Sequence, residues 1–180
     1  MVEATRNELV RGGYGALNHN AVAVAAGVAR ATVCRRWPTR AILAMDSLRD
    51  LARIPVALPD TGSMEGDLES FLEAIALVLE DPSNRRLLQA LGAAEAEDPA
   101  LREYLREFWT TRFASAAPLI ERAAERGELP PDTDPENLLE RLVAPVYFRA
   151  LVCGGDIDAG FRRNCVALAL LECRREIRGR

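Results

Sequence analysis

Histidine, lysine and closely spaced cysteines are scarce or missing in this chain of 180 residues. His19 is the only histidine, and none of the 23 basic residues is a lysine. Zinc sites need Cys and His ligands at short spacings, and a Ser-His-Asp triad needs a suitably placed histidine. We therefore expect no metal, no cofactor and no enzyme activity. Cys34, Cys153, Cys165 and Cys173 form no CxxC pair, so the zinc-site spacing is absent, and the thiols are expected to stay reduced because the default compartment is the cytoplasm.

Long apolar runs are also missing. No run approaches the roughly 18 residues that a membrane-spanning helix needs. The N-terminal segment lacks the basic region and apolar stretch of a signal peptide, so we expect a cytoplasmic protein. Hydrophobic residues make up 49% and charged residues 28%, which excludes global disorder. Strand-type alternation is missing throughout, which favours an all-α fold.

Glycine and proline divide the chain into nine expected helices. The pairs Asp98-Pro99 and Asp134-Pro135 are typical helix starts, and Ser83 could cap another helix. Prolines inside two of the helices, Pro118 and Pro145, are expected to kink them. A linker is expected at 54–62, and the helices at about 3–12, 20–26, 30–36, 40–53, 64–80, 84–96, 99–126, 135–152 and 157–177.

The charge is unevenly distributed between two expected domains. Residues 1–53 contain eight arginines and four acidic residues, a net charge of +4, whereas residues 54–180 carry a net charge of −8. A basic N-terminal domain followed by an acidic C-terminal domain suggests that the N-terminal domain binds a polyanion. The alternative is that the charges cluster by chance. We expect a helix-turn-helix DNA-binding domain at 1–53 and a helical ligand-binding and dimerisation domain at 54–180.

The segment 13–43 contains the most informative pattern. Its two short helices, at about 20–26 and 30–36, are separated as in a helix-turn-helix unit. Gly27 stands where the turn needs a left-handed backbone, and the small Ala23 lets the helices approach closely. Exposed arginines on the second of these helices could donate to guanine or neutralise phosphates. The apolar contacts between the helices are expected from Val22, Val28 and Val33.

This segment resembles the DNA-binding domain of the TetR family of transcriptional regulators. The matching positions are Gly13-Tyr14, Val22-Ala23, Ala26-Gly27-Val28, Arg30-Ala31-Thr32-Val33, Trp37, Arg40 and Ile42-Leu43. The C-terminal part is also similar to that of one TetR subgroup. The resemblance implies an all-α homodimer with an N-terminal three-helix DNA-binding domain. It further implies a repressor that a small apolar effector releases from a palindromic, double-stranded DNA operator.

The residues expected at the DNA come from this resemblance together with the arginine pattern. Arg30 and Arg40 are expected at phosphates, because helix edges and starts lie along the DNA backbone. For His19 the alternative is a partly buried ring that faces the first helix. The full set expected at DNA is His19, Asn20, Arg30, Ala31, Thr32, Arg35, Arg36 and Arg40.

Aromatic residues of the C-terminal domain are candidates for an effector pocket. In TetR-like proteins the helix that corresponds to 99–126 lines the pocket, whereas core packing is the ordinary explanation of such a cluster. Arg112 could pair with a ligand carboxylate, but surface charge is the favoured interpretation. The candidate pocket residues are Phe71, Phe108, Trp109 and Phe113.

The last helix is expected at a dimer interface. Between Cys165 and Cys173 only Glu172 is charged, so this helix is apolar almost all round and needs cover on two sides. A second copy of the chain could supply one side; the alternative is a monomer that buries the helix in its own core. Core packing is expected for Cys165 and Cys173. The candidate interface residues are Val143, Val146, Tyr147, Phe161, Cys165 and Leu168.

Two other functions stay open at this point. One is a TetR-like ligand-binding protein with weak or lost DNA binding, because Cys34 stands where the family usually has a phosphate-binding Tyr and the first helix begins almost at Met1. The remote alternative is a small helical enzyme that would depend on Asp and Glu pairs.

Overall fold

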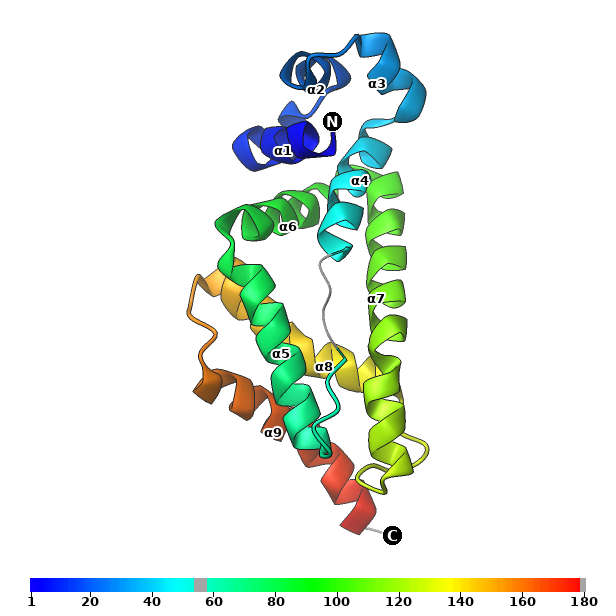
Figure 1. Ribbon diagram of the computed structural model, residues 1–180, viewed down its shortest axis with the longest axis vertical. Coiled ribbons are helices and arrows are strands. Elements are labelled where there is room, and N and C mark those ends of the chain that lie inside the picture. Colours follow the sequence, from blue (N-terminus) through cyan, green and yellow to red (C-terminus); the bar gives the residue numbers. More distant parts are fainter. Residues whose placement is uncertain (54–57, 179–180) are drawn as a thin grey trace. The chain divides into compact units, whose positions relative to one another are not determined.

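The computed structural model describes residues 1–53 and 58–178, with side chains as far as Leu171. Within these ranges the chain forms nine α-helices, one short π-helix and no strand, which confirms the all-α prediction (Figure 1). Residues 54–57 of the expected linker and the side chains of Glu172, Cys173 and Ile177 lie outside the described residues. The helices are α1 (Val2–Ala16), α2 (His19–Ala26), α3 (Arg30–Arg36), α4 (Arg40–Ala52), α5 (Met64–Glu80), α6 (Pro82–Ala94), α7 (Pro99–Glu125), α8 (Pro135–Phe148) and α9 (Ala159–Arg178).

Aspartate-proline pairs start three of these helices. Asp98 caps α7, and Asp134 caps α8, as the sequence predicts. The prediction that Ser83 caps α6 is wrong. Asp81 is the cap, and its Oδ1 accepts a hydrogen bond of 2.8 Å from the backbone N–H of Ser83. Proline at the first helical position lacks the N–H that would otherwise be unsatisfied there, so the Asp-Pro pair is the stronger start signal.

One helix ends where the sequence predicts, and another departs from its expected continuous course. α1 includes Gly13 with φ 68° and ψ −178°, so the regular part of α1 ends there. The helix expected at 135–152 ends as α8 at Phe148 and continues as the π-helix Arg149–Cys153. Gly154, with φ 66°, closes that segment. By contrast, α7 continues through Pro118 from Pro99 to Glu125.

The described residues divide into two compact units. The first comprises 1–53 and 81–108, and the second comprises 58–80 and 109–178. The first unit therefore holds α6 and the start of α7 besides α1 to α4. This grouping arises because α1 packs on both α4 and α6. The division into functional domains at residue 53 stays a prediction.

Leucines of α1, α4 and α6, together with Leu17 between α1 and α2, contribute to the core of the first unit. α1 packs on both α4 and α6, and α2 packs on α3. A polar contact joins α1 to α6, where the guanidinium of Arg6 donates to Oδ1 of Asn84 and lies 3.6 Å from Asp81. The fully buried side chains include Leu9, Leu17, Leu43, Leu48, Leu87 and Leu91.

The second unit packs α8 on α9 and α5, and buries one stripe of α5. The stripe follows the helical repeat and consists of Leu68, Leu72, Ile75 and Leu79. Nearby, Asp67 is only 1% exposed. Its carboxylate accepts hydrogen bonds from the backbone N–H (2.6 Å) and the hydroxyl (2.8 Å) of Thr61, and from Arg126 (3.0 Å). The buried charge is therefore compensated on both oxygens.

Clusters of metal-ligating side chains and membrane-spanning helices are both missing from the described part of the chain. No three His, Cys, Asp or Glu side chains gather there in a way that could hold a metal ion. None of the helices described is long and apolar enough to cross a membrane.

Candidate nucleic-acid interface

α2 and α3 form a helix-turn-helix unit with the geometry that the sequence predicts. Asn18 caps α2 by accepting the backbone N–H of Ala21 at 2.9 Å. Gly27 ends α2 in the left-handed region, with φ 66° and ψ 32°, where other residues are strained. Val22 and Val33 are fully buried and hold the two helices together. The turn therefore fixes which face of α3 is left for an external partner.

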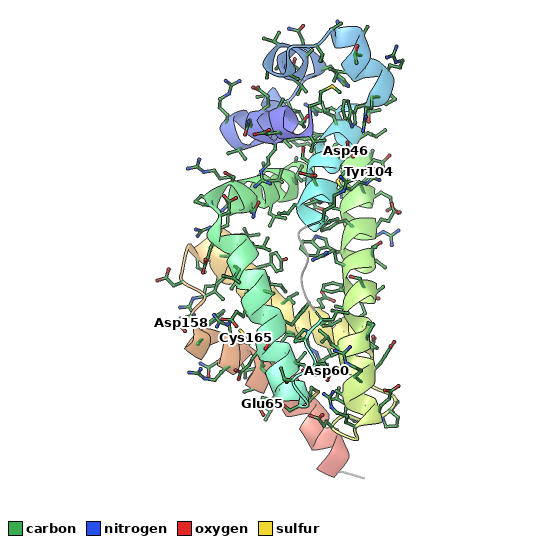
Figure 2. The ribbon with its side chains drawn as sticks, viewed as in Figure 1. Asp46, Asp60, Glu65, Tyr104, Asp158 and Cys165 are labelled. Atoms are coloured by element: carbon green, nitrogen blue, oxygen red, sulfur yellow. The ribbon has the colours of Figure 1, made fainter. Side chains whose placement is uncertain are left out.

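Trp37, directly after α3, joins three helices. Nε2 of His19 at the start of α2 donates to the Trp37 carbonyl oxygen at 2.6 Å. The indole Nε1–H of Trp37 donates to Asp46 on α4 at 2.9 Å, and Asp46 is labelled in Figure 2. The Arg36 guanidinium lies 5.0 Å from the Trp37 ring centroid. His19 is half-buried and bonded to the end of α3, and its role at DNA stays a prediction.

The residues expected at DNA lie largely on the solvent side of α2 and α3. Thr32, His19 and Arg40 are half-buried. Ala29, which precedes α3, provides no side-chain hydrogen bond to cap it. Cys34 is half-buried on α3 and holds the position of the family's usual tyrosine. The exposed members of the predicted set are Asn20, Arg30, Ala31, Arg35 and Arg36.

Arg40, the first residue of α4, lies against an aromatic ring. Its guanidinium carbon is 4.1 Å from the ring centroid of Tyr14, a cation–π distance. The Tyr14 hydroxyl donates to Oδ2 of Asp98 at 2.5 Å. Burial, together with this hydrogen bond to a carboxylate, raises the pKa of Tyr14 to about 12. Sequence reasoning missed this contact, because the three residues are far apart in the chain.

Comparison with known proteins decides the family. The model of the tetracyclin repressor-like C-terminal domain matches residues 58–169, which is more than half of the chain. The chain belongs to the TetR family.

TetR-family relatives match this chain over most of its length. It is 32% identical to the HTH-type transcriptional regulator AqdR of Rhodococcus erythropolis, over 83% of this chain and 72% of that protein. It is 26% identical to the HTH-type regulator YdeS of Bacillus subtilis, over 92% of this chain and 84% of that protein. The crystal structure of the TetR family transcription regulator SCO0332 gives a TM-score of 0.69 at 29% identity, covering 93% of both chains. The protein is therefore a DNA-binding transcriptional regulator and not an enzyme.

Aromatic side chains gather in the second unit of this TetR-family protein. The Trp109 and Tyr147 rings meet edge to face with centroids 5.1 Å apart, and the Phe113 ring lies 6.2 Å from Trp109. Burial raises the pKa of Tyr147 to about 12. Phe71 is buried in the same unit, whereas Phe108 belongs to the first unit. Tyr147 was expected at an interface, yet its ring lies with two of the expected pocket residues.

The predicted interface residues fall into three groups. Val143, Val146 and Cys165, the last labelled in Figure 2, are buried within the protomer. Tyr147 and Phe161 are half-buried, and a cation–π contact of 4.2 Å joins Phe161 to Arg149. Of the predicted set only Leu168 is exposed. The exposed large apolar side chains of this region are Phe148, Val152, Leu168 and Leu171.

Proposed function

We propose that this TetR-family protein is a repressor that reads a palindromic operator as a homodimer. The observation that carries the proposal is the exposed Arg30, Arg35 and Arg36 on α3, behind a turn that Gly27 holds in the left-handed region. Arginines so placed on a short helix can reach bases and phosphates of a major groove. Two copies of α3 about 34 Å apart would enter successive grooves of one operator.

The test is a gel-shift titration with duplex DNA from upstream of the protein's own gene. A discrete complex that outlasts excess random duplex supports an operator-binding repressor. A complex that random duplex removes completely would contradict operator reading. If the folded protein forms no complex at all, the alternative of a TetR-like ligand-binding protein without DNA binding replaces this proposal. Cys34 and the uncapped start of α3 are the features that would then explain the loss.

The homodimer is proposed to form through α8, the π-helix and α9. Phe148 and Val152 are four residues apart, and Leu168 and Leu171 are three apart, so each pair is spaced to share a helix face. A two-fold axis would bring the same apolar patch of a second chain onto this one. Of the residues predicted from sequence, Leu168 is the one that a partner could reach directly, because Val143, Val146 and Cys165 lie inside the protomer.

Sedimentation of matched variants tests the dimer. The wild type is expected at about twice the 19.8 kDa of one chain. Leu168→Glu should give the single-chain mass, because it would leave an unpaired charge in an apolar contact. Leu77 on α5 is 61% exposed against 67% for Leu168, so Leu77→Glu is the matched control and should stay dimeric. A wild-type protein at the single-chain mass would exclude the dimer.

A small apolar effector is proposed to bind beside Trp109, Phe113 and Tyr147. Partly exposed aromatic rings in mutual contact offer the apolar surface that such sites use. A ligand that binds more tightly to the dimer when its two α3 helices have the spacing of the DNA-free state lowers the DNA affinity. The decrease equals the difference between the binding free energies of the ligand for the two states. Compounds from a panel of small aromatic molecules should raise the melting temperature of the wild type. The same compounds should have little effect on Trp109→Ala, which should still bind DNA.

A further inference from the structure

Asp98 performs two tasks with its two carboxylate oxygens. Oδ1 accepts the backbone N–H groups of Ala100 (3.1 Å) and Leu101 (3.3 Å) and so caps α7. Oδ2 accepts the hydroxyl of Tyr14. The Tyr14 hydrogen bond first, and then these backbone bonds and the charge of Arg40, hold the pKa of Asp98 below its ordinary value. The carboxylate is therefore charged at neutral pH and polarises the phenol.

Tyr14 directly follows the end of the regular part of α1, and its side chain is buried there. Gly13 adopts φ 68°, which ends the regular part of α1 just before the tyrosine. Tyr14 is only 3% exposed, so packing holds its ring, and the Asp98 carboxylate holds its hydroxyl. A ring held in both ways is a rigid surface for a cation.

We propose that Tyr14 and Asp98 are positioning residues that orient Arg40 toward a DNA phosphate. The guanidinium of Arg40 lies over the Tyr14 ring and also hydrogen-bonds the Tyr14 hydroxyl, so the ring and the hydroxyl hold it together. Its other N–H groups lie in the guanidinium plane and can meet a partner. Those in-plane donors match the paired oxygens of a phosphate. Arg40 is half-buried, so part of the group is accessible to a partner. Without Tyr14, ordering of this long side chain would have to accompany DNA binding and would weaken it.

This inference rests on the proposed role of Arg40 at DNA, and it adds a dependence on α7. Asp98 is the cap of α7, and Trp109 lies about three turns further along the same helix. The position of the Arg40 guanidinium therefore depends on where α7 begins. A displacement of α7 would separate Asp98 from Tyr14 and remove the support of Arg40.

A double-mutant cycle in DNA binding tests the positioning role. The probe is a duplex that the wild-type protein selects from a random-sequence pool. Arg40→Ala should weaken binding about tenfold and reduce the salt dependence by about one counterion per protomer. Tyr14→Phe should weaken binding about threefold in the wild-type background and have no effect in the Arg40→Ala background. An equal effect of Tyr14→Phe in both backgrounds would overturn the proposal.

Asp98→Asn has a matched control in the same chain. Asparagine caps helices as well as aspartate does, so the substitution removes the acceptor of the Tyr14 hydroxyl and the charge, but keeps the cap. Asp134 caps α8 in the same Asp-Pro context in the other unit. Asp98→Asn should weaken DNA binding about threefold, whereas Asp134→Asn should not. Equal effects of the two variants would mean that the loss is not specific to the contact with Tyr14, and would overturn the positioning role.

A measurement without DNA separates this inference from the proposed function. Nuclear magnetic resonance relaxation of the Arg40 Nε–H group reports how ordered the guanidinium is. The group should be ordered in the wild type and in Asp134→Asn, and mobile in Tyr14→Phe and Asp98→Asn. If Arg40 is equally ordered in Asp98→Asn and the wild type, the positioning role is wrong even if the protein binds DNA. If the predicted loss of order occurs but no duplex is selected, the positioning contact stands and the proposed function fails.

Discussion

The region of α3 and the start of α4, in the first unit of this TetR-family protein, and the surroundings of Asp67, in the second unit, use charge in opposite ways. In the first unit, arginines on α3 are exposed, and the nearby Trp37 and Tyr14 contact Arg36 and Arg40 through their rings. In the second unit, Arg126 lies among carboxylates, and the most buried of these belongs to Asp67. An aromatic ring leaves the hydrogen-bond donors of an arginine available, whereas a carboxylate consumes them. The first arrangement suits an external anion, and the second stabilises the fold.

The largest expected effect is on the second unit. Asp67→Ala should lower the free energy of unfolding by about 3 kcal/mol, because Arg126 and Thr61 lose a buried acceptor. Asp60 also lies near Arg126, at 3.7 Å, but its side chain is 69% exposed. Asp60→Ala should therefore change the stability far less. Urea unfolding measures the free energy of unfolding of both variants. Equal decreases would contradict the expectation that the buried carboxylate stabilises the fold more than the exposed one.

The next effect is on the first unit and concerns binding. Arg36→Ala should weaken DNA binding by about 1–3 kcal/mol and leave the melting temperature nearly unchanged, because the side chain is exposed. Arg86 on α6 is also exposed in the same unit, so Arg86→Ala is the control with the same change in net charge. Titrations at several salt concentrations should show a reduced slope for Arg36→Ala alone. A variant that binds like the wild type would remove Arg36 from the interface.

Lowering the pH tests the stabilising role of the buried Asp67 carboxylate in the second unit. Burial alone would raise the pKa of Asp67, but the hydrogen bonds from Thr61 and Arg126 hold it below its ordinary value. Its contribution to stability is therefore complete above the unfolded pKa of about 3.9 and is lost as the pH falls through the folded pKa. Urea unfolding between pH 5 and pH 2.5 should show a steeper decline for the wild type than for Asp67→Asn. Parallel declines would contradict the assignment.

The smallest effect concerns an unsatisfied hydroxyl. Ser47 on α4 is 1% exposed, and its hydroxyl has no hydrogen-bond partner among the residues that the structure describes. Ser47→Ala removes this buried polar group, so it should raise the free energy of unfolding by up to about 1 kcal/mol. The side chain is buried in the first unit and is not among the residues proposed at DNA, so DNA affinity should not change. A destabilised variant in urea unfolding would indicate a hydroxyl contact after all.

Local signals predicted the helices well, because they act within a few residues. The Asp98-Pro99 and Asp134-Pro135 caps and the left-handed Gly27 depend on neighbouring backbone groups alone. The same reasoning predicts Ser83 as a cap, but the stronger Asp81-Pro82 pair lies directly before it and starts α6. The π-helix at Arg149–Cys153 has no comparable local signature, so the sequence indicated one continuous helix there.

Contacts between distant residues could not be predicted. Asp67 looked like an ordinary acidic residue at a helix start, and only the fold brings Arg126 to it. Likewise, the apolar last helix required cover on two sides, but the pattern could not say which residues the protomer itself covers. Cys165 and Val166 are buried there, whereas Leu168 is exposed. The exposed arginines of α3 were predicted, because the buried Val33 fixes the orientation of so short a helix.

The two tryptophans give each unit its own optical reporter. Trp37 is 3% exposed in the first unit with its indole N–H bonded to Asp46, and Trp109 is half-buried in the second unit beside Tyr147. The sequence contains no other tryptophan. Trp109→Phe would leave fluorescence that follows the end of α3 alone, and Trp37→Phe would leave fluorescence that follows the aromatic cluster. The emission of Trp37 in the first variant would thus report DNA binding, and the emission of Trp109 in the second would report effector binding, without any attached dye.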